Sequence, residues 1–159
     1  MTMKKTALLI VAGLFVAGLV TFLFAHLSYV IGFNTPLPAL SVWGLILAVM
    51  IGIGGVRILR RILTPLSAQG QARLRIPVVI YGGVISIMLL SAMIKLADIS
   101  WDAGASLLVS AGACLFYLSD ILLAWMKFVA PLRNGRIYNI FSYHLGQIAL
   151  IAGVIIQFT

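Results

Sequence analysis

The chain has 159 residues, of which 63% are hydrophobic and only 9% are charged. Soluble domains carry roughly 25% charged residues, so this sequence has too few polar side chains to cover a surface that faces water. These numbers exclude a soluble globular enzyme, a disordered tail and a disulfide-rich secreted domain. They indicate an integral membrane protein.

The net charge of +8 arises from 11 Lys and Arg against 3 Asp and Glu. In a soluble protein this excess would suggest binding to nucleic acid. Here the basic residues fall between apolar runs, as membrane topology requires, so we expect no nucleic-acid partner. Cys114 is the only cysteine in the sequence and therefore cannot form an intrachain disulfide.

Five apolar segments follow one another along the chain. They are too long and too continuously apolar for the strands of a transmembrane barrel, in which apolar and polar positions alternate. We predict an all-α, polytopic transmembrane helix bundle that forms a single domain over residues 1–159. The predicted helices span about residues 6–33, 39–56, 76–94, 103–126 and 137–158, and a cytoplasmic, arginine-containing connector covers 57–75.

The start of the chain resembles a secretory signal peptide, because Lys4 and Lys5 precede an apolar run. That run is longer than the apolar part of a signal peptide, and no good cleavage site with small residues follows it. We therefore expect an uncleaved first helix.

The distribution of Lys and Arg predicts the orientation of the bundle. With the N-terminus in the cytoplasm, ten of the eleven basic residues are cytoplasmic and only Lys95 lies outside. The opposite orientation reverses these numbers, so the positive-inside rule predicts N-in and C-out. We expect a multi-pass protein of the bacterial inner membrane.

Asp120 is the only acidic residue within a predicted helix. Ionisable groups at membrane depth are costly and are functional candidates by default. Asp120 precedes Lys127 by seven residues, which places it about 10 Å below the cytoplasmic boundary. Burial disfavours the ionised carboxylate, so an unpaired Asp120 is suited to donate a proton. The alternative is an aspartate that bonds to a neighbouring helix and stabilises the bundle.

His144 lies at a similar depth on the fifth helix, eight residues after Arg136. A short loop joins the fourth and fifth helices, so they should be antiparallel neighbours, and His144 could face Asp120. A hydrogen-bonded packing role for His144 is the alternative. Gln147 lies three residues further on and shares the face of His144.

Other polar residues within the helices are candidates with an open packing alternative. His26 and Tyr29 share a face of the first helix, whose register leaves His26 anywhere from the midplane to the outer leaflet. We expect Tyr81 to be a packing aromatic. With two histidines, one cysteine and no glutamate, neither a zinc site nor another metal site is expected, and we predict no cofactor. The weakest alternative is a haem held by His26 and His144.

Four motifs occur in order over residues 15–151. They are Gly18-Leu19 with Phe22–Tyr29 and Phe33; Pro77-Val78 with Tyr81, Ile85, Met88 and Ala92; Gly112-Ala113 with Phe116, Ser119-Asp120 and Leu123-Ala124; and Tyr143 with Gln147. Together they resemble the motifs of the YhhN-like lysoplasmalogenase family, whose members are multi-pass membrane hydrolases.

The resemblance implies hydrolysis of the vinyl ether bond of lysoplasmalogen to a fatty aldehyde and a glycerophospho-alcohol, with membrane lipids and a lysophospholipid substrate as partners. An acid protonates the β-carbon of the vinyl ether, water adds to the oxocarbenium ion, and the hemiacetal collapses. A second carboxylate would stabilise the cation and activate water, as in glycoside hydrolysis. Asp120 would be the proton donor or the water activator. Expected substrate contacts are His26, Tyr29, Tyr81, Ser119, Tyr143, His144 and Gln147, and Lys127, Arg133 and Arg136 could hold the phosphate.

The sequence departs from the family pattern in one respect. Family members resemble this chain preceded by about three further helices, the last of which carries a Gly-Asp motif with the second aspartate. No Gly-Asp dipeptide occurs here. We expect either a start site further upstream or a natural short form that is inactive alone. The alternative function is a catalytically silent helix-bundle subunit or a lipid-binding protein.

Overall fold

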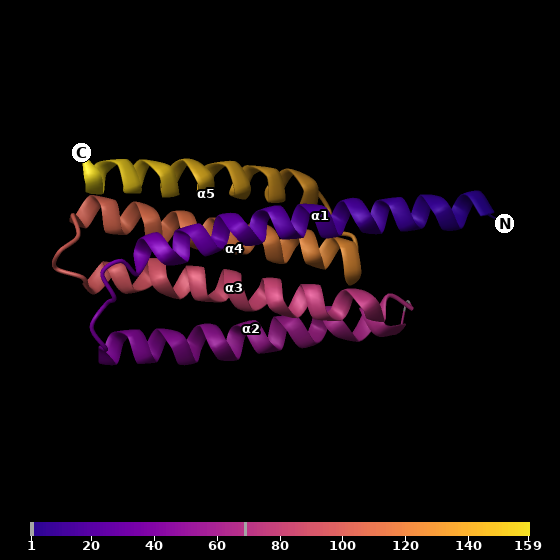
Figure 1. The fold of residues 1–159 in the computed structure, drawn as a ribbon, viewed down its shortest axis with the longest axis horizontal. Helices are drawn as coiled ribbons and strands as arrows, with labels where there is room; N and C mark the ends of the chain where they lie inside the picture. The colour runs from indigo at the N-terminus through magenta and orange to yellow at the C-terminus, as the bar shows by residue number, and fades with distance from the viewer. Residues whose placement is uncertain (1, 69) are drawn as a thin grey trace.

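Five α-helices form the described part of the protein (Figure 1). The computed structural model describes the backbone of residues 2–68 and 70–159, and the side chains from residue 13 onward except those of residues 15, 67 and 69. All five helices of this described part are long and apolar enough to cross a membrane, which confirms the predicted all-α fold. The elements are α1 (Thr2–Phe33), α2 (Val42–Ala68), α3 (Arg75–Ile94), α4 (Ala103–Phe128) and α5 (Gly135–Phe158), with short 3-10 helices η1 (Ala72–Leu74) before α3 and η2 (Lys95–Ala97) after it.

The end of α2 corrects the expected connector over 57–75. The helix continues through Arg57, Arg60 and Arg61 to Ala68, and the remaining link to α3 is short. Arginine is a good helix former, and the buried side chains of Ile62 and Leu66 pack against α3 and α4 through Val78 and Phe128. The basic residues therefore lie on the surface of a helix rather than in a loop.

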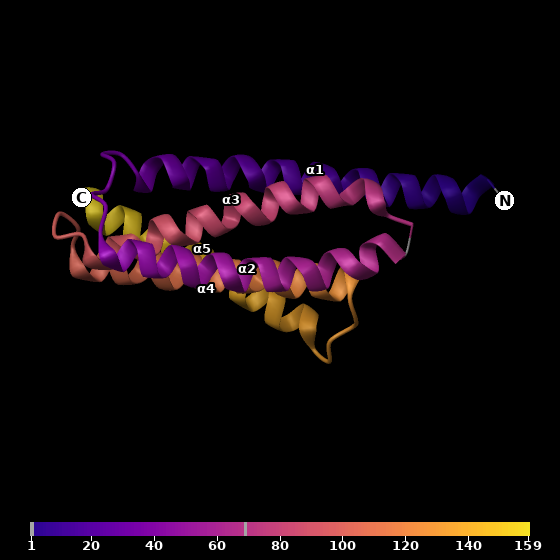
Figure 2. The same cartoon turned by 90° about the horizontal axis from the view of Figure 1, so that it is seen from below.

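α3 is the central helix of the bundle (Figures 1 and 2). It packs against α1, α2 and α4, and α5 packs mainly on α4. Within the described residues, α1 packs closely on α3 alone. The space between α1 and α4 is therefore bridged by side chains rather than by close backbone contact.

Glycines bring α4 and α5 into backbone contact. A Cβ atom on Gly146 would lie 2.9 Å from the carbonyl oxygen of Gly112, and a Cβ on Gly153 would lie 2.8 Å from the carbonyl oxygen of Ala105. Small residues allow membrane helices to approach closely, and this contact sets the depth of one helix relative to the other.

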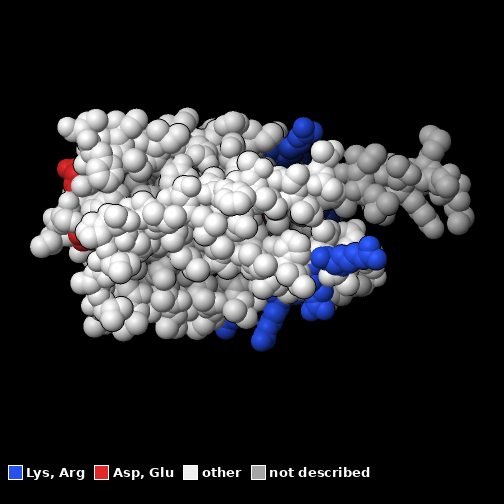
Figure 3. Space-filling model, in the orientation of Figure 1, with Lys and Arg blue, Asp and Glu red and all other residues white. Residues whose placement is uncertain are grey.

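Arginines and the aspartates of the α3–α4 loop lie toward opposite ends of the bundle (Figure 3). The described arginines lie toward the end where α2 joins α3 and α4 joins α5, which we call the cationic end, and Asp98 and Asp102 lie at the opposite, acidic end. The side chains of Lys4 and Lys5 lie outside the described part. The separation is the pattern that the positive-inside argument uses, and the N-in orientation itself stays a prediction.

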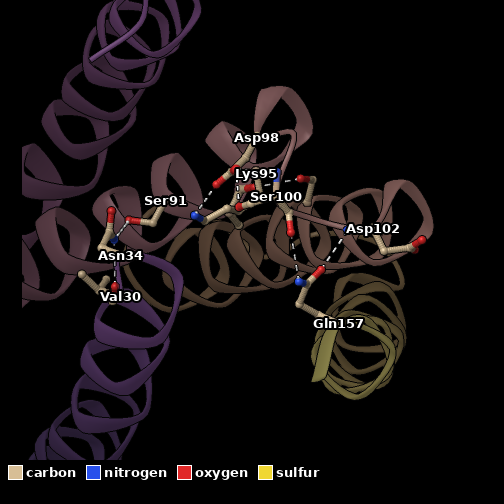
Figure 4. A network of polar contacts seen from close by, with 10 residues as sticks. Val30, Asn34, Ser91, Lys95, Asp98, Ser100, Asp102 and Gln157 are labelled. Atoms are coloured by element: carbon tan, nitrogen blue, oxygen red, sulfur yellow. Dashed lines mark hydrogen bonds and ion pairs between the residues drawn. The ribbon is translucent and has the colours of Figure 1, made fainter. Parts of the chain in front are cut away.

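Hydrogen bonds of side chains at the acidic end join the α3–α4 loop to neighbouring parts of the bundle (Figure 4). Nζ of the buried Lys95 donates a 2.8 Å hydrogen bond to Oδ2 of Asp98 and lies 5.4 Å from the ring centroid of Trp101. Oε1 of Gln157, at the end of α5, accepts from the backbone N–H of Asp102 at 2.9 Å. These contacts hold the α3–α4 loop against the end of α5.

Candidate functional site

An apolar cavity of about 570 Å³ lies between α1, α2, α3 and α4. Its volume falls in the range of roughly 300–1,000 Å³ that small-molecule pockets occupy. Most of its lining is aliphatic or glycine, and its polar side chains are Tyr81, Ser86, Tyr117 and Asp120. Two of these four residues, Tyr81 and Asp120, are candidates from the sequence.

Three helices contribute to a hydrogen-bonded cluster beside this cavity. The hydroxyl of Tyr81 on α3 donates a 2.5 Å hydrogen bond to Oδ2 of Asp120 on α4. Nε2 of His26 on α1 lies 3.1 Å from the same hydroxyl and 3.7 Å from Oδ2 of Asp120. The cluster therefore joins α1, α3 and α4 at one point.

His26 is completely buried within aromatic rings. Its ring centroid lies 4.8 Å from that of Phe116, edge to face, and 6.5 Å from that of Phe22. Because Tyr81 gives its proton to Asp120, the Tyr81 oxygen accepts from Nε2 of His26. This assigns a proton to Nε2, and Nδ1 is the one buried side-chain nitrogen or oxygen of the described residues without a partner.

Asp120 is largely buried but reaches the cavity, with 16% of its side chain exposed. The bond from Tyr81 is made to Oδ2, and Asp120 itself lines the cavity. The geometry fits both interpretations of Asp120, the proton donor and the aspartate that stabilises the bundle. Its carboxyl group is bonded to a neighbouring helix, and it also faces an apolar cavity. Such a group can pass a proton to an apolar ligand.

His144 corrects the expectation that it faces Asp120. Its side chain is exposed on α5, where its ring contacts that of Tyr143 at 5.0 Å. The histidine beside Asp120 is His26. Depth along a helix does not determine which way a side chain points, and α5 turns its glycine face toward α4. With one histidine buried and the other exposed, the two do not form a shared haem site.

The remaining expected contacts lie outside the cavity lining. The hydroxyl of Tyr29 donates a 3.3 Å hydrogen bond to Oε1 of Gln147, which joins α1 to α5. The ring of Tyr143 packs edge to face on Phe22 at 5.9 Å. Ser119 is buried, and its backbone oxygen accepts from Asn139 of α5 at 2.6 Å.

Tyr81 has a more specific place than the packing role that the sequence predicts. Its hydroxyl is the link between His26 and Asp120, and no sequence pattern distinguishes such a tyrosine from a packing aromatic.

A second hydroxyl pair in the cavity has no counterpart among the expected residues. Oγ of Ser86 and the hydroxyl of Tyr117 lie 3.2 Å apart. Gly55 of α2 allows this pair to reach the cavity, because a Cβ there would lie 3.3 Å from the Tyr117 hydroxyl. One signal was available in the sequence, since Tyr117 precedes Asp120 by three residues and so shares its helix face.

The expected phosphate ligands lie at the cationic end. Lys127, Arg133 and Arg136 are exposed, and Nζ of Lys127 lies 5.9 Å from the ring centroid of Phe128. Phe128 lines the cavity, so a cation stands close to the cavity's cationic end. No group of three metal-ligating side chains occurs among the residues that the structure describes.

Together, the membrane-length helices and the apolar cavity with a carboxyl group in its wall define a multi-pass membrane protein with a ligand-sized pocket. The chain belongs to the YhhN family, whose sequence profile matches residues 6–154, and this confirms the resemblance found in its motifs.

One curated relative shows how far the likeness extends. The chain is 30% identical over 145 residues to lysoplasmalogenase TMEM86B of Homo sapiens, a match that covers 91% of this chain and 55% of that protein. The chain therefore spans about half the length of the curated relative it matches. No solved structure matches the chain.

Proposed function

We propose that the chain is a lysoplasmalogenase-like hydrolase that cleaves the vinyl ether bond of a lysoplasmalogen, with Asp120 as its acid. The observation that carries this proposal is the position of Asp120, a carboxyl group held by Tyr81 in the wall of an apolar cavity. The similarity to TMEM86B supports the choice of a lysolipid as substrate.

The reaction begins with a proton transfer. The proton on Oδ1 of Asp120 moves to the β-carbon of the vinyl ether, and the α-carbon becomes part of an oxocarbenium ion. Water adds to that carbon and gives a proton back to the Asp120 carboxylate, and the resulting hemiacetal collapses to an aldehyde and an alcohol. The sum is one vinyl ether and one water consumed, with no oxidant or reductant required.

Tyr81 and His26 act on the carboxyl group rather than on the substrate. The bond from Tyr81 to Oδ2 stabilises the carboxylate that remains after the proton has left, and this charge in turn stabilises the oxocarbenium ion. His26 orients the Tyr81 hydroxyl through Nε2. The apolar lining of the cavity lowers the local dielectric constant, which strengthens both effects.

The second carboxylate of the family reaction does not come from the other acidic residues of this sequence. Asp98 and Asp102 lie in the loop at the acidic end. Asp98 accepts a hydrogen bond from Lys95, and Asp102 caps the N-terminus of α4. Without a second carboxylate, the same apolar cavity also supports the second candidate function, a lipid-binding protein without turnover.

Aldehyde release from lysoplasmalogen by the purified protein in lipid nanodiscs tests the proposal. Asp120→Asn should reduce release about 10²-fold or more, because it removes the acid while keeping the side-chain shape. Asp98→Asn is the matched control and should retain activity.

Equal release by the wild type and Asp120→Asn would overturn the assignment of the acid. A wild-type protein that binds lysolipid without releasing aldehyde would establish the lipid-binding alternative instead.

A further inference from the structure

The cavity reaches the outside of the bundle between α1 and α4. Leu14 of α1 and Leu123 of α4 both line the cavity, yet they are 69% and 44% exposed. Because α1 packs closely on α3 but not on α4, exposed lining residues on α1 and α4 mark an opening between these two helices. Both residues lie on the cationic side of the His26–Asp120 contact.

Side chains of α1 and α4 are in contact near the His26–Asp120 pair. Phe22 packs edge to face on Phe116 at 6.0 Å, and His26 lies 3.7 Å from Asp120. α1 and α4 are thus bridged by side chains at the cluster, while α1 packs closely on α3 alone within the described chain.

Gly18 lies on the α1 side of this opening and lines the cavity. A Cβ atom added there would meet no heavy atom within 4 Å, in contrast to the glycines between α4 and α5. The space beside Gly18 is therefore not needed for helix packing. It is open to whatever surrounds the bundle.

The surroundings at this level are hydrocarbon. Gly18 and Leu123 both lie within membrane-length spans, Val16–Phe33 and Ala103–Phe128. An apolar opening in this position admits an apolar chain from the bilayer without exposing polar backbone to lipid. The basic residues at the same end of the bundle place an anionic headgroup at the membrane surface while its chain lies inside.

We propose that the seam bordered by Leu14, Gly18 and Leu123 is a lateral portal, through which one hydrocarbon chain of a membrane phospholipid passes from the bilayer into the cavity. This proposal takes only the identity of the substrate from the proposed function. Entry of the chain does not depend on catalysis.

Two bulky substitutions test the portal from its two sides. Gly18→Trp and Leu123→Trp fill the opening from α1 and from α4. Their matched controls are Gly32→Trp, at an exposed glycine of α1 that also has no heavy atom within 4 Å, and Leu118→Trp, at an exposed leucine of α4. Neither control residue lines the cavity.

The probe is a lysophosphatidylcholine with a diazirine in its chain, added in trace amount to nanodiscs that contain the full chain. Photolysis should attach it to cavity-lining residues such as Ile51 and Ile85. We expect about a tenfold loss of this labelling in Gly18→Trp and Leu123→Trp, because the indole ring fills the opening, and no loss in the controls.

Equal labelling of the portal variants and their controls would overturn the portal, and so would a wild-type cavity that takes no label. Aldehyde release is recorded in parallel from the same nanodiscs. A labelled cavity without aldehyde release in any variant would contradict the hydrolase function and leave the portal standing.

Discussion

The hydroxyl of Tyr81 donates its 2.5 Å hydrogen bond to Oδ2 of Asp120, so a residue of α3 holds the carboxyl group of α4. The same hydroxyl lies 3.1 Å from Nε2 of His26. In an apolar interior a polar chain of this kind is stable when every member is paired and costly when one is removed. The site is therefore sensitive to changes that leave Asp120 itself intact.

Tyr81→Phe should lower kcat/KM for lysoplasmalogen about 10²-fold, the usual effect of removing one donor from a developing charge. Two buried groups lose their partner, so stability should also fall by about 1–3 kcal/mol. Tyr117→Phe is the control, because it removes a hydroxyl from the same cavity without touching Asp120. The same loss of activity in both variants would contradict a specific role for Tyr81.

His26→Phe keeps an aromatic ring against Phe116 but removes Nε2. We expect aldehyde release to fall less than in Tyr81→Phe, because the bond from Tyr81 to Asp120 remains. Thermal unfolding in detergent should move to lower temperature, since the Tyr81 oxygen loses its donor. His144→Phe, at the exposed histidine, should change neither measurement, and an equal effect of the two substitutions would count against the cluster.

Gly146→Ala should destabilise the protein by about 1–3 kcal/mol, because its Cβ would lie 2.9 Å from both the Gly112 oxygen and the Phe116 nitrogen. Thermal unfolding measures the effect. Gly54→Ala introduces the same methyl group within α2 where no heavy atom lies within 4 Å, and alanine is the better helix former there. If Gly146→Ala is as stable as Gly54→Ala, α4 and α5 are not in backbone contact.

Asp98 makes the stability of the acidic end depend on pH. The hydrogen bond from Lys95, followed by that from Ser100, lowers the pKa of the Asp98 carboxyl to about 2. A carboxyl group with a lowered pKa in the folded state stabilises the fold above its unfolded pKa of about 3.9, and this stabilisation is lost as the pH falls through the folded value.

The unfolding temperature should therefore fall on acidification from about pH 4 to about pH 2. Asp98→Asn should show a smaller fall than the wild type. Asp102→Asn keeps a side-chain oxygen for the cap of α4 and should follow the wild type. A fall in Asp98→Asn as large as that of the wild type would show that Asp98 does not carry the effect.

The predicted N-in, C-out orientation places Arg133 in the cytoplasm and Ser100 outside. In a Cys114→Ala background, a membrane-impermeant maleimide should label Ser100→Cys in intact cells and should label Arg133→Cys only after permeabilisation. Both positions are exposed, so access to the reagent depends on the side of the membrane. The reverse pattern would invert the topology.

The helices were predictable because their signal is local. A continuous apolar segment can be recognised as a helix without reference to other segments. Four of the five helices therefore begin and end within about one turn of the expected residues. α2 is the exception, because its extension past Arg57 depends on the burial of Ile62 and Leu66 against other helices. Asp120 was also visible locally, as an ionisable residue in an apolar run.

The sequence by itself therefore determined the membrane class, the five helices and the acidic residue to examine. Only the tertiary structure decided that His26 rather than His144 lies beside Asp120, and that Tyr81 connects them. The rotation of a helix about its axis is set by packing between helices. The spacing of residues within one helix shows which side chains share a face, but it does not determine which neighbour that face meets. The close contact of α4 with α5 sets the rotation of α5 and leaves His144 exposed.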